Sequence, residues 1–167
     1  MKPALLVIDI QNAYLDDMSE NEKKNAFQHI NWSISLFRHH GFPVIRVYHH
    51  EEQRGPHPGD PKFEFPETIA IKGDDPKIVK HYPSSFKKTD LEKFLRDRSI
   101  DTLYLCGLSA VYCVLATYFG AEERDFNVFF IKNALLSHKE WYTGMIEDAY
   151  EAVSCPNLKF MFDNMKK

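Results

Sequence analysis

Several features that mark common protein classes are missing from this chain of 167 residues. Its three cysteines, Cys106, Cys113 and Cys155, form no CxxC pair, which disfavours a zinc ribbon or a thioredoxin-type site. No stretch approaches the ~20 apolar residues of a membrane-spanning helix. Asp9 interrupts the first apolar run too early for a secretion signal. We therefore expect a cytoplasmic protein with free thiols that does not act at a membrane.

Concentrated positive charge and a phosphate-binding glycine motif are missing as well. The chain has 21 Lys and Arg against 24 Asp and Glu, and no dense basic run, which argues against nucleic acid as a partner. The first apolar strand leads into DIQNAY and not into GxGxxG, which disfavours a dinucleotide-binding protein. What the chain does have is 44% hydrophobic and 14% aromatic residues. Residues 1–167 are therefore expected to form a single domain with a large core.

Strand-like and helix-like segments alternate along the whole sequence. Strands are expected at 4–8, 43–48, 78–80, 102–106, 127–131 and 158–162, and helices at 20–40, 89–98, 113–124 and 137–154. Ser19 with Glu22 and Thr89 with Glu92 match the capping box, and Ser137 is expected to cap the last helix. Residues 50–66, rich in proline and glycine, are expected to form a lid loop. The alternation predicts an α/β three-layer sandwich, with a mostly parallel, Rossmann-like sheet and helices on both faces.

Three residues with chemical potential follow predicted strands, at the carboxyl ends where such folds bind ligands. Cys113 comes after a turn opened by Gly107, at the start of a predicted helix, where the helix dipole would lower the thiol pKa and favour a thiolate. Asp9 could take a proton from that thiol, and Lys80 could stabilise the thiolate and orient Asp9. Taken singly, each has an ordinary alternative: a buried structural cysteine, a turn-capping aspartate and a surface lysine.

The segments LLVIDIQNAY, KHYPSSF and CGLSAVYCVLAT resemble the three catalytic motifs of the isochorismatase-like, or cysteine hydrolase, superfamily. That superfamily includes nicotinamidases, N-carbamoylsarcosine amidases and ureidoacrylate hydrolases, and the resemblance extends over nearly the whole chain. It implies Asp9 as general base, Lys80 as its charged partner and Cys113 as nucleophile. It further implies a cis peptide bond at Leu108-Ser109 and an oxyanion hole formed by the backbone N–H groups of Ser109 and Cys113.

The activity implied by this resemblance is amidase-like hydrolysis of a C–N bond in a small molecule, through a thioester on Cys113. No cofactor is expected. The protein is expected to assemble as a homo-oligomer of two or more copies. Two alternatives stay open: a noncatalytic binding or assembly module, and isochorismatase-type hydrolysis. The latter is disfavoured because true isochorismatases have an aspartate where this chain has Cys113.

A substrate pocket and a metal site are the remaining questions for the sequence. The expected pocket residues are Tyr14, Phe65, Phe86, Leu108, Tyr112 and Trp141. Aromatic rings there would suit a small planar or apolar substrate, although packing in the core or at the rim explains them equally well. Nicotinamidases bind a divalent ion through Asp-x-His after the second strand, whereas this chain reads VYHHEEQRGPH. We predict no metal, and note His49, His50, Glu51 and His57 as the residues that could still form a site.

Overall fold

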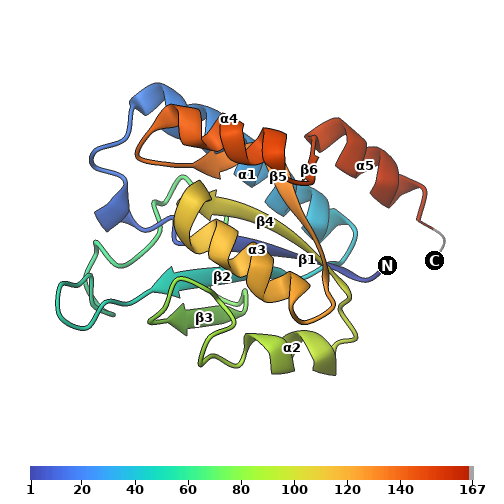
Figure 1. The fold of residues 1–167 in the computed structure, drawn as a ribbon, viewed down its shortest axis with the longest axis horizontal. Coiled ribbons are helices and arrows are strands. Elements are labelled where there is room, and N and C mark those ends of the chain that lie inside the picture. The colour runs from blue at the N-terminus through green and yellow to red at the C-terminus, as the bar shows by residue number, and fades with distance from the viewer. Residues whose placement is uncertain (166–167) are drawn as a thin grey trace.

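A central sheet of six strands organises the molecule, and the computed structural model describes residues 1–165 (Figure 1). The strand order is β3-β2-β1-β4-β5-β6, and the pairings between these neighbours are all parallel. The strands are β1 (Pro3–Ile8), β2 (Val44–His49), β3 (Lys77–Lys80), β4 (Thr102–Leu108), β5 (Asn127–Leu136) and β6 (Ala152–Val153). The helices are α1 (Glu20–His39), α2 (Leu91–Asp97), α3 (Leu115–Glu122), α4 (Glu140–Ala149) and α5 (Cys155–Asp163), with short turns at Asn12–Tyr14 and Ala110–Val114.

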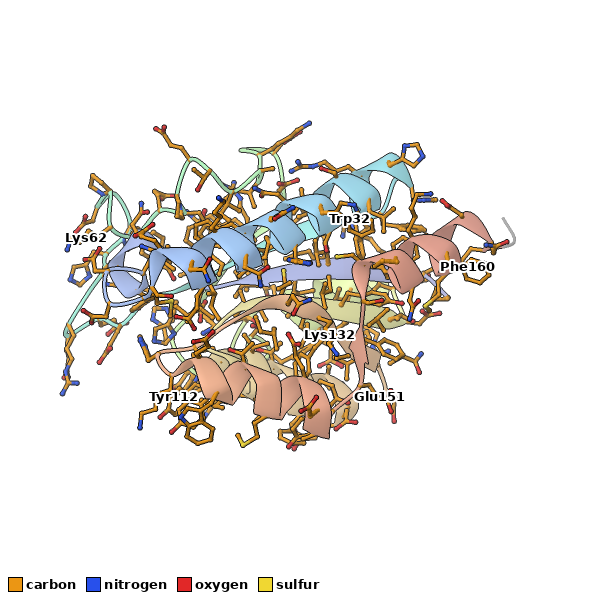
Figure 2. The ribbon with its side chains drawn as sticks, turned by 90° about the horizontal axis from the view of Figure 1, so that it is seen from above. Trp32, Lys62, Tyr112, Lys132, Glu151 and Phe160 are labelled. Atoms are coloured by element: carbon orange, nitrogen blue, oxygen red, sulfur yellow. The ribbon has the colours of Figure 1, made fainter. Side chains whose placement is uncertain are left out.

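Helices cover both faces of this sheet, as the sequence predicts. Every residue of β1 and β4 is buried, which is the pattern of central parallel strands that pack on both sides. Seen from above, α1 and α4 lie on opposite sides of the strands (Figure 2). One core layer contains the buried residues of α1 and α5, and the other contains those of α2 and α3. The three-layer α/β architecture is therefore confirmed.

The centre of the sheet is a topological switch point. From β1 the chain continues to β2 and β3 on one side, whereas β4 is followed by β5 and β6 on the other. The carboxyl ends of β1 and β4 consequently open a crevice between diverging connections, which is where such folds bind ligands. Gly107 permits the close approach of the two strands: its φ is +120°, and a Cβ there would lie 2.1 Å from the Ile8 carbonyl oxygen.

One predicted strand is wrong. Residues 158–162 form the end of helix α5, not a strand. The Ser154 side chain accepts a hydrogen bond from the Asn157 N–H and Pro156 lies in the first turn, both of which favour a helix start. Leu158 and Phe162 are buried four residues apart, so the apolar run follows a helical period.

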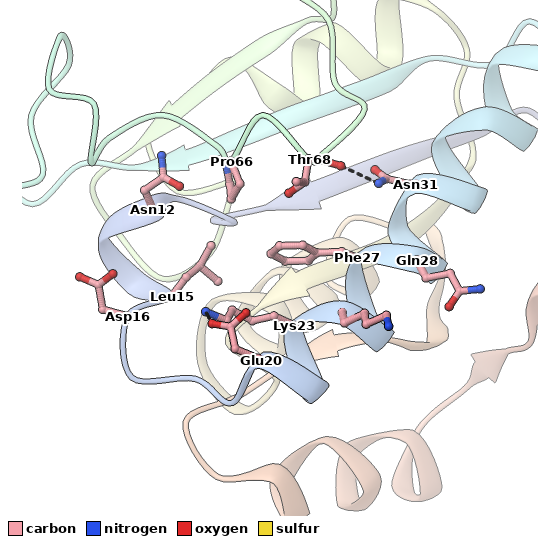
Figure 3. A pocket seen from close by; sticks show the side chains of 11 residues that line it. Asn12, Leu15, Asp16, Glu20, Lys23, Phe27, Gln28, Asn31, Pro66 and Thr68 are labelled. Atoms are coloured by element: carbon pink, nitrogen blue, oxygen red, sulfur yellow. Dashed lines mark hydrogen bonds and ion pairs between the residues drawn. The ribbon is translucent and has the colours of Figure 1, made fainter.

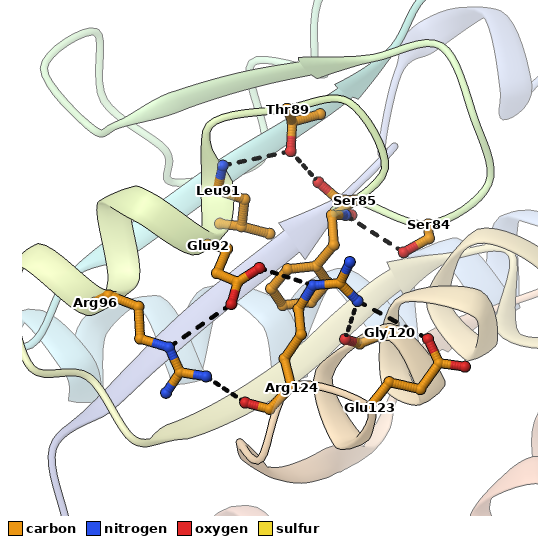
Figure 4. Close-up of polar contacts among 10 residues, drawn as sticks. Ser84, Ser85, Thr89, Leu91, Glu92, Arg96, Gly120, Glu123 and Arg124 are labelled. Carbon is orange, nitrogen blue, oxygen red and sulfur yellow. Dashed lines mark hydrogen bonds and ion pairs between the residues drawn. The ribbon is translucent and has the colours of Figure 1, made fainter.

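Two predicted helix starts are also wrong. Thr89 precedes the cap of α2 at Asp90, and its hydroxyl donates to the Ser85 carbonyl and accepts from the Leu91 N–H (Figure 4). Ser137 is buried and caps nothing, because β5 continues to Leu136 and α4 begins only at Glu140. The helix expected over 137–154 is accordingly shorter, and the residues after it contribute β6.

Candidate active site

The first two residues of the site form a buried ion pair between two strand ends. Asp9 directly follows β1, has a φ of +52°, and donates its N–H to the Val47 carbonyl at 2.9 Å. Its side chain is 4% exposed and that of Lys80, the last residue of β3, is 0% exposed. The Lys80 Nζ lies 2.7 Å from Asp9 Oδ2. A left-handed backbone at a non-glycine residue is the kind of strain that concentrates at functional sites.

Cys113 lies next to this pair, in the turn that follows a third strand. It lies in the π-helical turn Ala110–Val114 between β4 and α3, and its sulfur, an Asp9 carboxylate oxygen and a His49 nitrogen all lie within 4.8 Å of one another. The turn is anchored by Thr117, whose hydroxyl donates to the Cys113 carbonyl at 2.7 Å and accepts from the Ser85 N–H at 3.0 Å. Asp9, Lys80 and Cys113, which are far apart in the sequence, therefore meet at the switch point.

Electrostatics at the site favour a neutral thiol. Burial, together with the negative charge of Asp9, raises the pKa of Cys113 to about 12, although Lys80 acts in the opposite direction. Burial likewise raises the pKa of Asp9 despite the ammonium beside it. The thiolate expected from the position at a helix start is thus not favoured in the resting protein, because desolvation and the charge of Asp9 raise the thiol pKa. Cys113 needs a base to become a nucleophile.

The turn that leads to Cys113 is held on both sides. The peptide bond between Leu108 and Ser109 is cis. The Ser109 hydroxyl lies 2.9 Å from that of Ser137, a contact that is buried and links the end of β4 to the end of β5. Ser137, expected to cap a helix, therefore supports this turn instead.

Gln11 is a site residue that the sequence analysis missed, and His49 was expected only as a residue that could form a metal site. His49 ends β2, and its Nδ1 lies 3.2 Å from the Lys80 Nζ. The buried Gln11 amide accepts from the His49 N–H at 2.7 Å and donates to the His49 carbonyl at 3.1 Å. The only signal for Gln11 was its place in DIQNAY, two residues after the catalytic aspartate candidate.

A resident metal ion does not fit the donor atoms found here. Asp9, His49 and Cys113 offer an oxygen, a nitrogen and a sulfur close together. However, the Lys80 ammonium already contacts two of the three residues, so a divalent cation would face a fixed positive charge. His50 is not in this donor group; its Nε2 lies 3.1 Å from His57 Nδ1.

Three of the six expected pocket residues pack in the core. Phe65 packs on Tyr48 with ring centroids 4.6 Å apart and the rings tilted by 33°, and Leu108 is 3% exposed. Phe86 stacks on Phe126, which precedes β5 and so lies toward the opposite end of the sheet from the active site. Phe65 and Phe86 are therefore core residues in this structure, and their place in a substrate pocket stays a prediction. A hydrophobic core and an aromatic pocket have the same sequence signature.

The other three expected pocket residues lie at the surface or beside the site. Tyr112 and Trp141 are 63% and 61% exposed. Tyr14 is half-buried next to His49, and burial together with the charges of Asp9 and Cys113 raises its pKa to about 12. Its hydroxyl is buried without a hydrogen-bond partner among residues 1–165. Tyr14 also borders a cavity of about 440 Å³ that it shares with His57.

A larger groove of about 780 Å³ lies away from this chemistry. It is formed by the first half of α1 and the loop around Pro66, and is lined by Leu15, Phe27, Asn31 and Thr68 among others (Figure 3). None of the three strand-end residues borders it. The groove is therefore no part of the candidate active site.

Comparison with known proteins agrees with this fold. The sequence model of the isochorismatase domain matches residues 3–155. The chain belongs to the isochorismatase family. It is 35% identical over 131 residues to the uncharacterized isochorismatase family protein YddQ of Bacillus subtilis, covering 75% of this chain and 73% of that protein.

Solved structures of this family have the same fold. The N-carbamoylsarcosine amidase from Thermoplasma acidophilum is 28% identical, with a TM-score of 0.79 over 92% of this chain and 95% of that one. An isochorismatase-like hydrolase from Alkaliphilus metalliredigens has a TM-score of 0.86 over 97% and 99% of the two chains at 18% identity. This chain thus belongs to a family of hydrolases with a three-layer α/β fold. Among residues 1–165 no helix has the length and apolar character to cross a bilayer.

Proposed function

We propose that this protein is a cysteine-dependent hydrolase that cleaves a C–N bond of a small amide-type substrate. The observation that carries the proposal is the meeting of Asp9, Lys80 and the Cys113 sulfur at the switch point of the sheet. A nucleophile, a base and a fixed positive charge are the groups that covalent acyl transfer needs. The likeness to N-carbamoylsarcosine amidase supports an amide-type substrate.

The first step follows from the charges of the site. Asp9 removes the thiol proton and the sulfur attacks the substrate carbonyl, so that a C–S bond forms and the carbonyl oxygen becomes an oxyanion. Moving the proton from Cys113 to Asp9 leaves the net charge of the site unchanged. The Lys80 ammonium faces the Asp9 carboxylate before the transfer and the Cys113 thiolate after it. Because that ammonium is buried 2.7 Å from Asp9, its field is only weakly screened.

The remaining steps return the enzyme to its starting state. The N–H groups of Ser109 and Cys113, both in the turn after β4, are proposed to donate to the oxyanion. The C–N bond then breaks, and the departing nitrogen takes the proton from Asp9. Water attacks the thioester with Asp9 again as base, the C–S bond breaks, and Cys113 regains its proton as the acid leaves.

The proposal is tested with a panel of small amides, ureides and carbamoyl compounds assayed for ammonia release. Cys113→Ala should lose activity by roughly 10⁴-fold while its circular dichroism and melting curve stay like those of the wild type. Cys155→Ala is the matched control, because that thiol lies at the start of α5, 4.0 Å from Ser33 Oγ, and should keep full activity. A Cys113→Ala enzyme that hydrolyses its best substrate at the wild-type rate would refute the mechanism.

A further inference from the structure

The sheet order places a fourth strand end inside the site. Asp9 follows β1 and Lys80 ends β3, but these strands are not neighbours, because β2 lies between them. The Asp9–Lys80 ion pair must therefore form beside the carboxyl end of β2. The residue there is His49, which is the register partner of Lys80 in the β2–β3 pairing.

The Lys80 ammonium needs more than one acceptor. It is fully buried and has three N–H donors, and a buried charge is tolerated only when it is paired and hydrogen-bonded. Asp9 Oδ2 at 2.7 Å takes one donor, and the Cys113 sulfur is close enough for Lys80 to lower its pKa. Among residues 1–165, His49 Nδ1 at 3.2 Å is the other acceptor that contacts the ammonium.

His49 is built to serve as that acceptor. Only a neutral imidazole protonated on Nε2 has a free lone pair on Nδ1. Burial and the nearby positive charges of Lys80, His81 and His50 lower the pKa of His49 to about 4, which keeps the ring neutral at physiological pH. The buried Gln11 amide bonds both the N–H and the carbonyl of His49, so the backbone that carries the ring is held in place.

We propose that His49 is a positioning residue, which accepts a hydrogen bond from Lys80 and holds the ammonium between Asp9 and Cys113. This inference rests on the proposed cysteine mechanism. It gives the carboxyl end of β2 a role in the site, although His49 lies outside the three motif segments. It also explains why a donor set of oxygen, nitrogen and sulfur surrounds an ammonium group here.

Two substitutions at His49 separate this role from simple packing. His49→Leu removes the acceptor, and His49→Asn restores an oxygen at the same number of bonds from the backbone as Nδ1. We expect His49→Leu to lower kcat by about 10²-fold with little change in KM, because a small displacement of a catalytic group has an effect of this size. His49→Asn should recover at least about tenfold of that loss. His39→Leu is the matched control and should leave kcat unchanged, since that histidine is exposed in the last turn of α1.

Thiol reactivity gives a second readout. Without its anchor, Lys80 stabilises the thiolate less, so alkylation of Cys113 by iodoacetamide at pH 9 should be slower in His49→Leu by about threefold or more and close to normal in His49→Asn. Equal losses of activity in the two variants, with alkylation of Cys113 unchanged in both, would overturn the proposal. So would a folded His49→Leu enzyme with the wild-type kcat.

A third measurement needs no variant and no substrate. Nitrogen-15 NMR of the wild-type imidazole at pH 7 should show a neutral ring with the proton on Nε2. An imidazolium, or a proton on Nδ1, would contradict the assignment even if the variants failed to fold. Because this readout is independent of turnover, it also distinguishes a failure of the His49 assignment from a failure of the proposed hydrolase activity.

Discussion

The buried ion pair between Lys80 and Asp9 allows a quantitative test. Lys80→Met removes the ammonium but keeps a side chain of similar length, and leaves the Asp9 carboxylate at 4% exposure without its partner. Breaking a buried pair on one side typically costs about 3–5 kcal/mol. For a domain of this size, that corresponds to a fall in Tm of roughly 6–20 °C.

The pH dependence of this loss has a definite sign. Lys80 lowers the pKa of Asp9, so its removal raises that pKa further above the value in the unfolded chain. The folded variant then holds a proton that the unfolded chain releases, and its stability falls as the pH rises from about 4 through the raised pKa. The deficit relative to the wild type should therefore be larger at pH 8 than at pH 5.

Urea unfolding at both pH values measures these differences, and a double variant provides the control. In Asp9→Asn/Lys80→Met no charge is buried, so at pH 8 it should be more stable than Lys80→Met alone by about 2 kcal/mol or more. A single variant that loses less than about 1 kcal/mol at pH 8, or a double variant no more stable than the single, would refute the reasoning.

Three further outcomes follow from the same structure. Asp9→Asn should reduce hydrolysis by about 10²–10⁴-fold yet speed alkylation of Cys113, because the carboxylate is both the base and a cause of the raised thiol pKa; slower alkylation would contradict this. Gly107→Ala should cost more than about 3 kcal/mol in urea unfolding, as its Cβ would lie 2.1 Å from the Ile8 carbonyl oxygen at a φ of +120°, and a near-neutral change would rule out that contact. Phe162→Ala should lower the free energy of unfolding by about 3–5 kcal/mol in the same assay, since the ring is 3% exposed in the core. A loss below about 1 kcal/mol would contradict the packing of α5 against the core.

Residues 158–162, predicted as a strand and found in α5, show where a local pattern is ambiguous. An apolar run of five residues fits a strand or a helix by hydrophobicity alone. In the structure Ser154 and Pro156 form the helix start, and the burial of Leu158 and Phe162 on one side distinguishes the two periods. Ser137 shows the reverse case, in which a residue with a good local capping pattern is used for a contact with Ser109 across the sheet.

By itself, the sequence determined the alternation of strands and helices, and hence that Asp9, Lys80 and the turn containing Cys113 follow strands. These properties depend on residues close together in the chain, and period and turn chemistry express them directly. Only the tertiary structure decided that β2 lies between β1 and β3, which brings His49 to the Lys80 ammonium. It also decided that the pKa of the Cys113 thiol is raised, because the groups that bury it and the charge of Asp9 come from distant segments.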